Sequence, residues 1–517
     1  MDANTRPWWR YAVVYQIYPR SFADSGRAVA EPGVGDLDGL TARLDHLAWL
    51  GVDAIWLSPV FRSPMADFGY DVSDYCDIDP VFGDLAAMDR LIAAAHARGI
   101  RVLLDWVPNH TSNLHPWFQE SRQDRTNPKA DWYVWRDEPA TNWNASFLDH
   151  RPAWTYDEQR GQYYLHCFLP EQPDLNWDHP DVEAAMHETL RFWLDRGVDG
   201  FRMDVVHLIG KDYADDPADA VGKGWSHVTF NDVPITHERL RRIRALLDGY
   251  PGDRTSVGEV YLLDEQRMAT YHGTTDAPEL HLSFNFRFLW SPWEPGGLAA
   301  LARGTTEILD RHGAGPTWAL SNHDVPRHRG RYGGDELDAR MAAVMLLLLP
   351  GTAFLYQGEE LGLVDADVPA NRRVDPGGRD GCRAPIPWDG GPLHGWHADP
   401  WLPFPPEADT RNVAAMRADE GSILHWYRRL IALRRGQPAF HSDTVTFLEG
   451  SPGLFAWTYP DGAGGEWVAY VNPTSEPQDA GGRLTGATVV LATDPSLERH
   501  ALGTELPARV ALVAHRA

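Results

Sequence analysis

The sequence predicts an α/β protein, a (β/α)₈ TIM barrel with an inserted subdomain after strand three and a C-terminal antiparallel β-domain. Three observations predict this fold. From Tyr11 to about Tyr356, eight short apolar runs alternate with amphipathic helical patterns, which is typical of a closed parallel barrel. A long aromatic-rich segment interrupts this alternation after the third run. After about Gly436 the alternation gives way to short runs separated by turn residues.

Each apolar run has the length of a strand that is buried in a parallel sheet. The runs are Ala12–Tyr18, Ala54–Leu57, Arg101–Val107, Gly200–Met203, Ser256–Val260, Leu280–Phe286, Thr317–Leu320 and Thr352–Tyr356. The helices between them have apolar residues three and four positions apart. They include Leu40–Leu50, Leu85–Arg98, Val182–Arg196, Ile235–Leu247 and Leu337–Leu349. The pattern is least regular around the sixth strand.

Two segments lie outside the repeating pattern. Residues 111–178 carry many aromatic residues, Asn and Pro and no helix of barrel type. A segment this long inside a compact domain is usually functional. We therefore expect residues 111–178 to form an inserted subdomain, named subdomain B, that rests on the barrel mouth. Residues 1–110 and 179–435 would then form the barrel. The short alternating runs in residues 436–517 predict a small β-sandwich-like domain. Its expected strands are Thr444–Leu448, Leu454–Thr458, Trp467–Val471, Ala487–Ala492 and Arg509–Val513.

Composition limits the classes of partner. The net charge of −26 disfavours nucleic acid and anionic membranes, because both attract basic surfaces. The longest strongly apolar run, Met341–Leu349, is too short to span a bilayer, and the first residues lack the pattern of a signal peptide. Three distant cysteines (Cys76, Cys167 and Cys382) imply no disulfide framework. We therefore expect a soluble cytoplasmic protein, present as a monomer or homodimer. The 22 tryptophans fit platforms for sugar rings as well as core positions.

Arg202 and Asp204 stand two positions apart in the fourth predicted strand. The period of two puts both side chains on one face. An arginine beside a carboxylate keeps it ionised near neutral pH, and an ionised carboxylate held in place can act as a nucleophile or stabilise charge. A structural ion pair at the strand end is the alternative.

Other polar residues fall at comparable strand ends. The third strand ends near Asp105 and His110, the fifth at Glu259, and the seventh at Asn322–Asp324. Barrel enzymes carry their active sites at the C-terminal ends of the strands, so we expect these side chains to face one mouth. Crowded carboxylates cannot all ionise equally, and two carboxyls with divided roles are what glycoside hydrolysis requires. A zinc site is disfavoured, since the chain has no HExxH motif or cysteine pair.

Several segments at these strand ends resemble the motifs of glycoside hydrolase family 13, the α-amylase family. They are LLDWVPNH at Leu103–His110, GFRMDVVH at Gly200–His207, GEV at Gly258–Val260 and SNHD at Ser321–Asp324. YQIYPRSF near the N-terminus and GYDVSDY at Gly69–Tyr75 add to the match. QPDLNW at Gln172–Trp177 resembles the fifth motif of the oligo-1,6-glucosidase subfamily. The resemblance spans Trp8 to about Asp389.

The resemblance implies a role for each matching residue. Asp204 would be the nucleophile, Glu259 the general acid/base and Asp324 the third carboxylate, which holds sugar hydroxyls. The substrate-binding residues would be Asp67, Tyr70, His110, Phe147, Phe168, Arg202, His323 and Arg383. Among them, Asp67 and Tyr70 would close the pocket behind the terminal glucose, Phe147 and Phe168 would form aromatic walls, and Arg383 would lie near the pocket rim. The flanking sequence of Phe147 fits a core position equally well.

The sequence departs from the family pattern at Asp24–Asp36. Relatives run D-x-N-x-D-G-x-G-D there, an oxygen-rich loop suited to a calcium-type ion. The present loop is longer, lacks the middle ligands and contains Arg27. We therefore expect no metal and no cofactor.

The resemblance implies a retaining, exo-acting α-glucosidase that removes terminal glucosyl units from short α-glucosides. A glucosyltransferase or isomerase of the trehalose synthase or sucrose isomerase type would use the same residues and differ in the acceptor. A non-enzymatic interaction subunit is a third reading, but such a chain would lack the carboxylates that are present here. The linkage preference is expected to depend on Val205, which directly follows Asp204.

Overall fold

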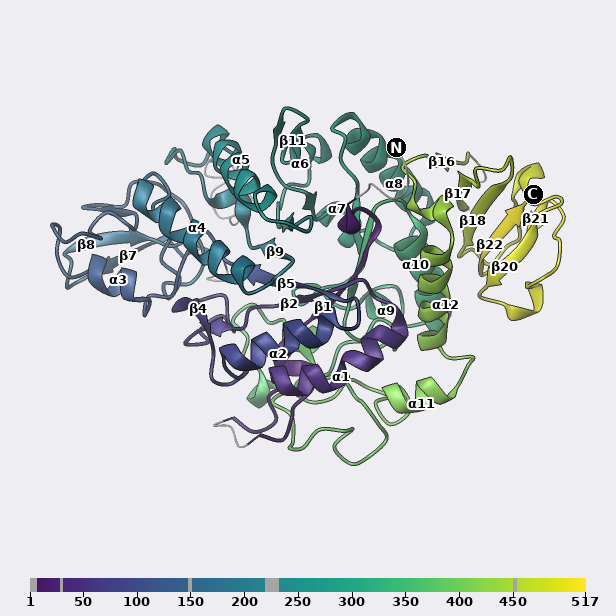
Figure 1. The fold of residues 1–517 in the computed structure, drawn as a ribbon, viewed down its shortest axis with the longest axis horizontal. Coiled ribbons are helices and arrows are strands. Elements are labelled where there is room, and N and C mark those ends of the chain that lie inside the picture. The colour runs from purple at the N-terminus through teal and green to yellow at the C-terminus, as the bar shows by residue number, and fades with distance from the viewer. Residues whose placement is uncertain (1–6, 28–30, 147–150, 219–231, 450–452) are drawn as a thin grey trace.

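The computed structural model describes residues 7–27, 31–146, 151–218, 232–449 and 453–517. Eight parallel strands form its centre in the order β13–β10–β9–β5–β2–β1–β15–β14 (Figure 1). They are β1 (Val13–Ile17), β2 (Ala54–Leu57), β5 (Arg101–Trp106), β9 (Gly200–Met203), β10 (Thr255–Gly258), β13 (Leu282–Ser283), β14 (Thr317–Ala319) and β15 (Thr352–Tyr356). The sheet curves into a nearly closed barrel, and the predicted fold is confirmed.

The strands are apolar on both faces because each face is covered. In β1, Val14 packs with Trp56 and Phe354 inside the barrel. Val13 and Tyr15 point the other way and belong to the outer core beneath the helices. Gly200 begins β9 at a close approach to β10, since a Cβ there would lie 2.3 Å from the carbonyl oxygen of Thr255.

The sixth strand is shorter than the expected Leu280–Phe286. Only Leu282–Ser283 pairs with β10, because Asn285 caps the next helix by accepting a hydrogen bond from the backbone N–H of Phe288. No strand pairing joins β13 to β14 in this described part of the barrel. A side chain bridges the gap instead, as the Thr317 hydroxyl donates to the carbonyl of Ser283.

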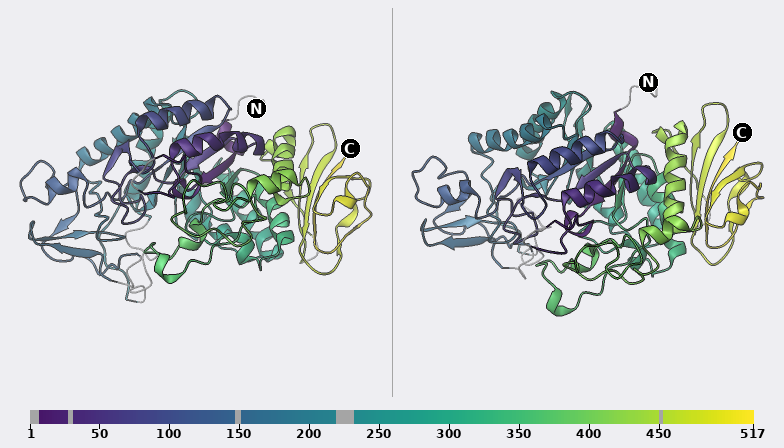
Figure 2. Two further views of the ribbon diagram at one scale, coloured as in Figure 1. Left: turned by 90° about the horizontal axis from the view of Figure 1, so that it is seen from below. Right: turned by 60° about the horizontal axis from the view of Figure 1, so that its bottom comes forward.

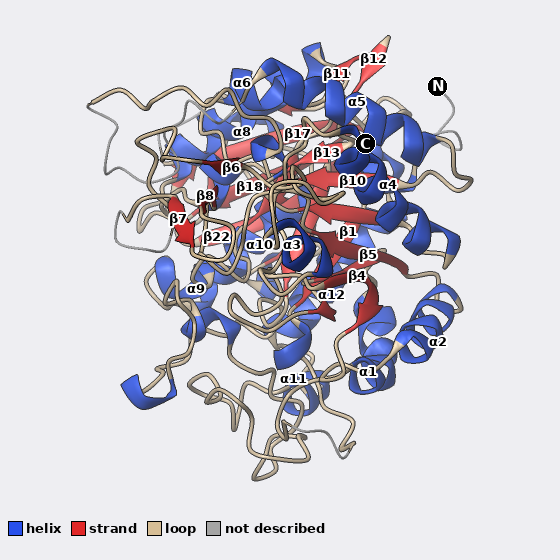
Figure 3. Ribbon diagram, turned by 90° about the vertical axis from the view of Figure 1, so that its left-hand side faces the viewer, coloured by secondary structure: helices blue, strands red, loops and turns tan. Residues whose placement is uncertain are grey.

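Helices cover the outside of the barrel (Figures 1 and 3). Carboxylate caps start several of them: Asp36 accepts from the N–H of Gly39, and Asp84 from that of Ala87. The helices are α1 (Leu37–Leu50), α2 (Leu85–His96), α4 (Pro180–Asp195), α5 (Pro234–Asp248), α6 (Glu265–Thr270), α7 (Phe286–Leu289), α8 (Pro295–Arg311), α9 (His328–Arg331), α10 (Glu336–Leu348), α11 (Val413–Ala418) and α12 (Ile423–Gly436).

The segment after β5 extends away from the barrel at the left of Figure 1. It contains α3 (Pro116–Ser121) and an antiparallel sheet of β6 (Trp135–Arg136), β7 (Trp154–Asp157) and β8 (Gln162–Leu165). The backbone of Leu175 donates to the carbonyl of Asn109, and His110 forms a bridge with Asp174. The end of the inserted segment thus lies against the end of β5. Short pairs are formed by β3 (Phe61–Arg62) with β4 (Asp74–Ile78) and by β11 (Gly273–Thr274) with β12 (Ala277–Pro278).

The C-terminal residues form a five-stranded antiparallel sheet at the opposite end of the molecule (Figure 2). Its strands are β16 (Thr446–Phe447), β17 (Phe455–Pro460), β18 (Glu466–Asn472), β22 (Val510–Arg516) and β20 (Thr488–Ala492), and β19 (Gln478–Asp479) pairs with β21 (Glu505–Leu506). The sheet packs on α10, where Trp457 and Tyr459 donate to the carbonyl of Leu348. In the described residues, no helix has the length and apolarity needed to cross a membrane.

Candidate active site

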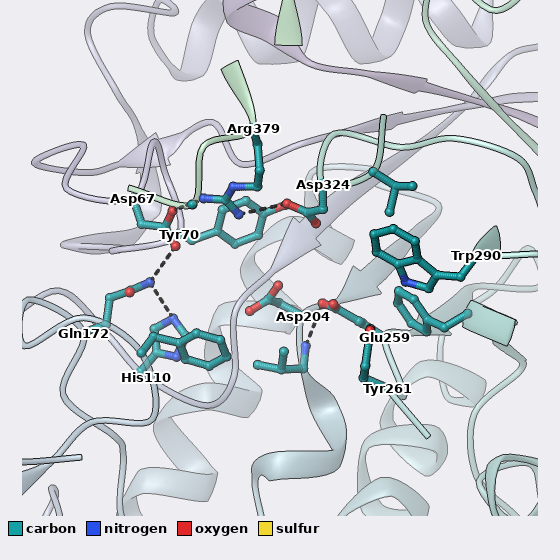
Figure 4. Close-up of a pocket in the computed structure, with 15 residues that line it drawn as sticks. Asp67, Tyr70, His110, Gln172, Asp204, Glu259, Tyr261, Trp290, Asp324 and Arg379 are labelled. Atoms are coloured by element: carbon teal, nitrogen blue, oxygen red, sulfur yellow. Dashed lines mark hydrogen bonds and ion pairs between the residues drawn. The ribbon is translucent and has the colours of Figure 1, made fainter. Parts of the chain in front are cut away.

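The polar side chains expected at the strand ends meet at one mouth of the barrel (Figure 4). A cavity of about 220 Å³ opens there, smaller than the roughly 300–1,000 Å³ of pockets that hold drug-sized ligands. Its lining consists of Asp67, Tyr70, His110, Phe168, Gln172, Asp204, Val205, Glu259, Tyr261, Phe286, Trp290, Asp324, Val325, Gly377 and Arg379.

Arg202 joins three carboxylates beneath the cavity. Its Nη1 lies 2.9 Å from Asp105 and 2.6 Å from Asp204, and its Nη2 binds Glu259. β9 lies between β5 and β10, and the register places Arg202 beside Asp105. Only 2% of Arg202 is exposed, so it contacts the lining residues from below and does not itself line the cavity.

Val205 has an unusual backbone. Its φ is 33° and its ψ is 39°, in the left-handed region that β-branched residues rarely adopt. This turn ends β9 directly after Asp204 and aims the N–H of Val205 at Glu259 Oε2, 3.2 Å away. The same turn places the Val205 side chain in the cavity wall beside Phe168. Sparsely populated backbone conformations cluster at functional sites, and this one brings the N–H that follows Asp204 within hydrogen-bond distance of Glu259.

An ion pair crosses the far end of the cavity. Arg379 Nη2 lies 2.7 Å from Asp67, and its Nη1 lies 2.9 Å from Asp324. Gln172 donates to Asp67 over 3.2 Å and lies 3.1 Å from His110 Nε2. In Figure 4, Asp67, Gln172 and His110 stand on the side of Asp204 away from Trp290 and Tyr261, and Arg379 and Asp324 lie above Asp204. The cavity therefore has a polar closed end.

The side nearer Glu259 is apolar. Tyr261 and Phe286 pack with their ring centroids 4.7 Å apart, and Trp290 is 47% exposed at the rim.

Phe168, expected as an aromatic wall, lines the cavity and packs on His110 with 5.1 Å between ring centroids. The other expected wall, Phe147, lies outside the described residues.

Besides Arg202, two more of the expected substrate-binding residues lie behind the lining. Arg383 was expected near the rim, but its side chain is fully buried and lies 3.2 Å from Asp324 and 3.0 Å from Asp375. Arg383 ends a short 3₁₀ helix, Asp380–Arg383, and Arg379, at the residue before that helix, reaches the cavity instead. His323 is also buried; it stacks on Tyr70 with 5.5 Å between ring centroids and contacts the Tyr70 hydroxyl at 2.5 Å.

Burial and neighbouring charges set the protonation of the carboxyls. Burial raises the pKa of Asp105 to about 6, against the pull of Arg202. Burial also raises the pKa of Asp204 well above its ordinary value, with a further rise from the charge of Glu259. Three carboxylates share one guanidinium here, so Asp204 keeps a proton to a higher pH than an exposed carboxyl would.

Asp324 behaves in the opposite way. Burial opposes ionisation, but His323, Arg379 and Arg383 together hold the pKa of Asp324 below its ordinary value. Burial lowers the pKa of His110 to about 4 and that of His323 to about 3. Near neutral pH, Asp324 is therefore an anion and both imidazoles are neutral.

The Asp24–Asp36 loop is held by protein groups. Asp24 accepts hydrogen bonds from the backbone of His397 at 3.0 and 3.1 Å. Asp36 accepts from Ser25 and caps α1. Among the residues that the structure describes, no group of three or more His, Cys, Asp or Glu side chains is placed to hold a metal. The donor set thus does not fit the calcium-type ion that the motif of relatives suggests.

A family model described as alpha amylase, catalytic domain, matches residues 16–443. This chain belongs to the α-amylase family. A probable alpha-glucosidase of Rhizobium meliloti (strain 1021) is 44% identical over 485 residues, covering 86% of this chain and 85% of the relative. An oligo-1,6-glucosidase of Parageobacillus thermoglucosidasius is 38% identical over 506 residues, 88% of each chain. The crystal structure of an alpha-glucosyl transfer enzyme matches with a TM-score of 0.89 at 38% identity, covering 99% of this chain and 100% of that one.

The predicted place in glycoside hydrolase family 13, in its oligo-1,6-glucosidase group, is thereby confirmed. Several cavity residues of this α-amylase family member were not predicted from the sequence. Arg379 and Gln172 stand inside motifs that the sequence does reveal, GRDGCRAPIPW and QPDLNW. Tyr261 follows Glu259 by two residues, and this closeness to a predicted catalytic residue could have indicated that it lines the cavity. Trp290 follows the short helix α7, and no sequence pattern marked it.

Proposed function

We propose that this chain is a retaining, exo-acting α-glucosidase that hydrolyses terminal non-reducing α-glucosyl residues of short oligosaccharides. The observation that carries the proposal is the pairing of Asp204 and Glu259 on the two terminal nitrogens of Arg202 at the base of a small cavity. The glucosidase names of the similar relatives support the substrate class.

The retaining course follows from the closeness of the two carboxyls. Both carboxyls bind the terminal nitrogens of one guanidinium, which holds them close together and supports the spacing of a retaining pair. Retaining enzymes hold their carboxyls about 5–5.5 Å apart, whereas inverting enzymes keep about 6.5–9.5 Å for that water.

In the proposed mechanism, ionised Asp204 attacks the anomeric carbon while Glu259 transfers its proton to the leaving glycosidic oxygen. This mechanism requires Asp204 to be ionised and Glu259 to carry a proton when substrate binds. A water molecule then enters, Glu259 takes one of its protons, and the resulting hydroxyl displaces Asp204 from the anomeric carbon. Asp324, held as an anion, accepts hydrogen bonds from the sugar hydroxyls.

The closed end of the cavity supports exo action. Asp67 and Arg379 form an ion pair where a longer chain would have to pass. The terminal sugar would therefore enter with its non-reducing end toward Asp67. The side chains of Asp67, Gln172 and His110 are then available to its hydroxyls.

The proposal is tested with Asp204→Asn and Glu259→Gln. Asp204→Asn should lose at least about 10⁴-fold in kcat, since no other group can attack the anomeric carbon. Glu259→Gln should lose activity mainly on glycosides with poor leaving groups, because activated aryl glucosides need no proton donor in the first step. Proton NMR of fresh product should show the α-anomer. A β-anomer, or near-native turnover by Asp204→Asn, would contradict the assignment.

A glucosyltransferase or isomerase is the second candidate. It is favoured by the apolar wall of Tyr261, Phe286 and Trp290 beside Glu259, which can hold an acceptor other than water, and by the transfer activity in the name of a similar structure. Resolving the products from maltose, isomaltose, sucrose and trehalose separates the candidates. Glucose dominates for a hydrolase, whereas new disaccharides dominate for a transferase or isomerase.

We further propose that the enzyme works in the cytoplasm on small-molecule substrates. The three cysteines support this location, because none of them forms a disulfide and reduced thiols are typical of that compartment. A monomer or homodimer remains our expectation for the assembly, and light scattering would measure it.

A further inference from the structure

A fully buried polar cluster lies behind His110 and outside the cavity. It consists of Asn109, Asp174, Lys211 and Cys167, which are between 0% and 9% exposed. The ammonium of Lys211 donates to three acceptors: Asn109 Oδ1 at 2.8 Å, the carbonyl of Leu208 at 2.7 Å, and Asp174 Oδ2 at 3.1 Å. A buried ion pair seldom repays its desolvation as stability alone, which raises the question of what this one holds in place.

The cluster fixes the orientation of the Asn109 amide. Its Oδ1 faces Lys211, and its Nδ2 lies 3.2 Å from Asp174 Oδ1. Exchanging the two ends of the amide would set N–H against ammonium and carbonyl against carboxylate. Both contacts would be repulsive, so the amide has one orientation.

That orientation aims an N–H at His110. Asn109 Nδ2 lies 3.1 Å from His110 Nδ1, so Nδ1 must accept. A neutral imidazole carries its one proton on the other nitrogen. We infer that Lys211, Asp174 and Asn109 act together as positioning residues that hold His110 in the Nε2–H tautomer. Burial keeps this ring neutral, since it lowers the pKa of His110 to about 4.

The cavity side of His110 then holds a second donor. Gln172 is oriented by the backbone N–H of Leu169, which donates to its Oε1 over 3.1 Å. Its Nε2 therefore points N–H groups at Asp67 and toward His110 Nε2, 3.1 Å away. Two donors face each other there without an acceptor. An oxygen on the cavity side of both nitrogens would accept from both, and a hydroxyl of the bound sugar supplies that oxygen.

This inference rests on the proposed function for the identity of the oxygen, but the tautomer can be measured without substrate. The test is ¹⁵N NMR of the enzyme labelled in its histidine rings, with His110→Gln identifying the His110 signals. Near pH 7 we expect His110 to show a protonated Nε2 and an unprotonated Nδ1. A proton on Nδ1, shared with the backbone carbonyl of Tyr70 that also faces the ring, would overturn the inference.

Asn109→Asp is the informative variant. It keeps the shape of the side chain and an acceptor for Lys211, but it presents oxygen in place of N–H to His110 Nδ1. The proton of His110 should move to Nδ1, and KM for the glucoside should rise at least tenfold with a smaller change in kcat. An unchanged tautomer in this variant would contradict the role of Asn109.

Lys211→Met tests the outer part of the cluster. Losing the ammonium frees the amide of Asn109 to turn, so we expect a mixture of His110 tautomers, a raised KM and a lower melting temperature. Lys211→Met/Asp174→Asn should recover much of the single tautomer, because the amide oxygen that this change leaves at position 174 still accepts from Asn109. Loss of stability with an unchanged tautomer and KM would show that Lys211 is only structural.

Lys129→Met is the matched control, because Lys129 also pairs with a carboxylate, Glu120 at 2.7 Å, but is not among the residues that line the cavity. It should change neither the spectra nor KM. Should the enzyme release glucose from no α-glucoside while the spectra follow expectation, the proposed function fails and the tautomer assignment stands.

Discussion

Val205 combines a β-branched side chain with a left-handed backbone directly after Asp204. Its side chain fills the cavity wall where, in the proposed mechanism, the leaving group departs. A branched apolar group narrows this exit and offers no hydroxyl. It should therefore disfavour the bulkier secondary-hydroxyl linkage and tolerate the flexible primary one.

We expect α-1,6 disaccharides to be cleaved at least as well as α-1,4 disaccharides, with a shift toward α-1,4 in Val205→Thr. A methyl-sized contact changes discrimination by roughly 1–3 kcal/mol, and the shape and β-branching of Thr match those of Val. The measurement is kcat/KM for isomaltose and maltose in both proteins. A wild type that strongly prefers maltose, with the same ratio in the variant, would place linkage choice elsewhere.

The sequence does not predict which of Arg379 and Arg383 reaches the cavity. They stand four residues apart in one motif, and both contact Asp324. Which of them reaches the cavity depends on the turn between them, for which the sequence carries no signal. Arg202, Asp204 and Glu259 were predictable together because each falls at the end of an apolar run, and the ends of parallel strands meet at one mouth of a barrel.

Among the elements, the strands followed from continuous apolar runs, and the sixth was the difficult one. Its run extends to Phe286, but the capping side chain of Asn285 starts a helix after only two paired residues. The run of apolar letters therefore spans a strand, a cap and a helix. The long helix α8 was not predicted from the same irregular region.

The helix α5 carries a charge clamp at its first turn. His237 Nδ1 lies 2.7 Å from Glu279, and its Nε2 lies 3.5 Å from Asp232. Burial opposes protonation, but Asp232 and Glu279 raise the pKa of His237 to about 9. Because the ordinary value is about 6.5, this pair contributes stability that is complete below about pH 6.5 and is lost as the pH rises through 9.

His237→Gln should therefore lower the free energy of unfolding at pH 6 by about 1 kcal/mol, a value reduced for partial solvent exposure. The difference from wild type should vanish by about pH 10. Thermal melts across this range measure it. Arg242→Gln on the same helix, which breaks an exposed pair with Glu183, should show no such pH dependence. A loss of unfolding free energy in His237→Gln that is the same at every pH would contradict the role of these two ion pairs.

For the molecule as a whole, the C-terminal sheet completes the core around α10. Trp457 is fully buried and donates to the carbonyl of Leu348 at 3.0 Å. Trp457→Ala should cost about 3–5 kcal/mol and lower the melting temperature of the barrel as well as of the sheet. Trp290→Ala, at an exposed position, should change stability by less than about 0.5 kcal/mol. Independent melting of the two parts would contradict a shared core.

Activity should not depend on a divalent cation. The carboxylates of the Asp24–Asp36 loop are occupied by protein donors, and the proposed chemistry is carried by carboxyl groups. We expect the same kcat/KM in EDTA as in added calcium. Activity that disappears in EDTA and returns with calcium would contradict this.

The gap between β13 and β14, bridged by the Thr317 hydroxyl, makes these two strands the edges of an otherwise continuous sheet of eight strands. Glu259 follows β10, the neighbour of one edge, and Asp324 follows β14, the other edge. Opening the barrel at this seam needs no ladder of backbone hydrogen bonds to break. Amide protons of β13 and β14 should therefore exchange with deuterated water sooner than those of β1. Transient opening between these two strands would set how far Asp324, which holds the sugar, can move from Glu259, which protonates the leaving oxygen.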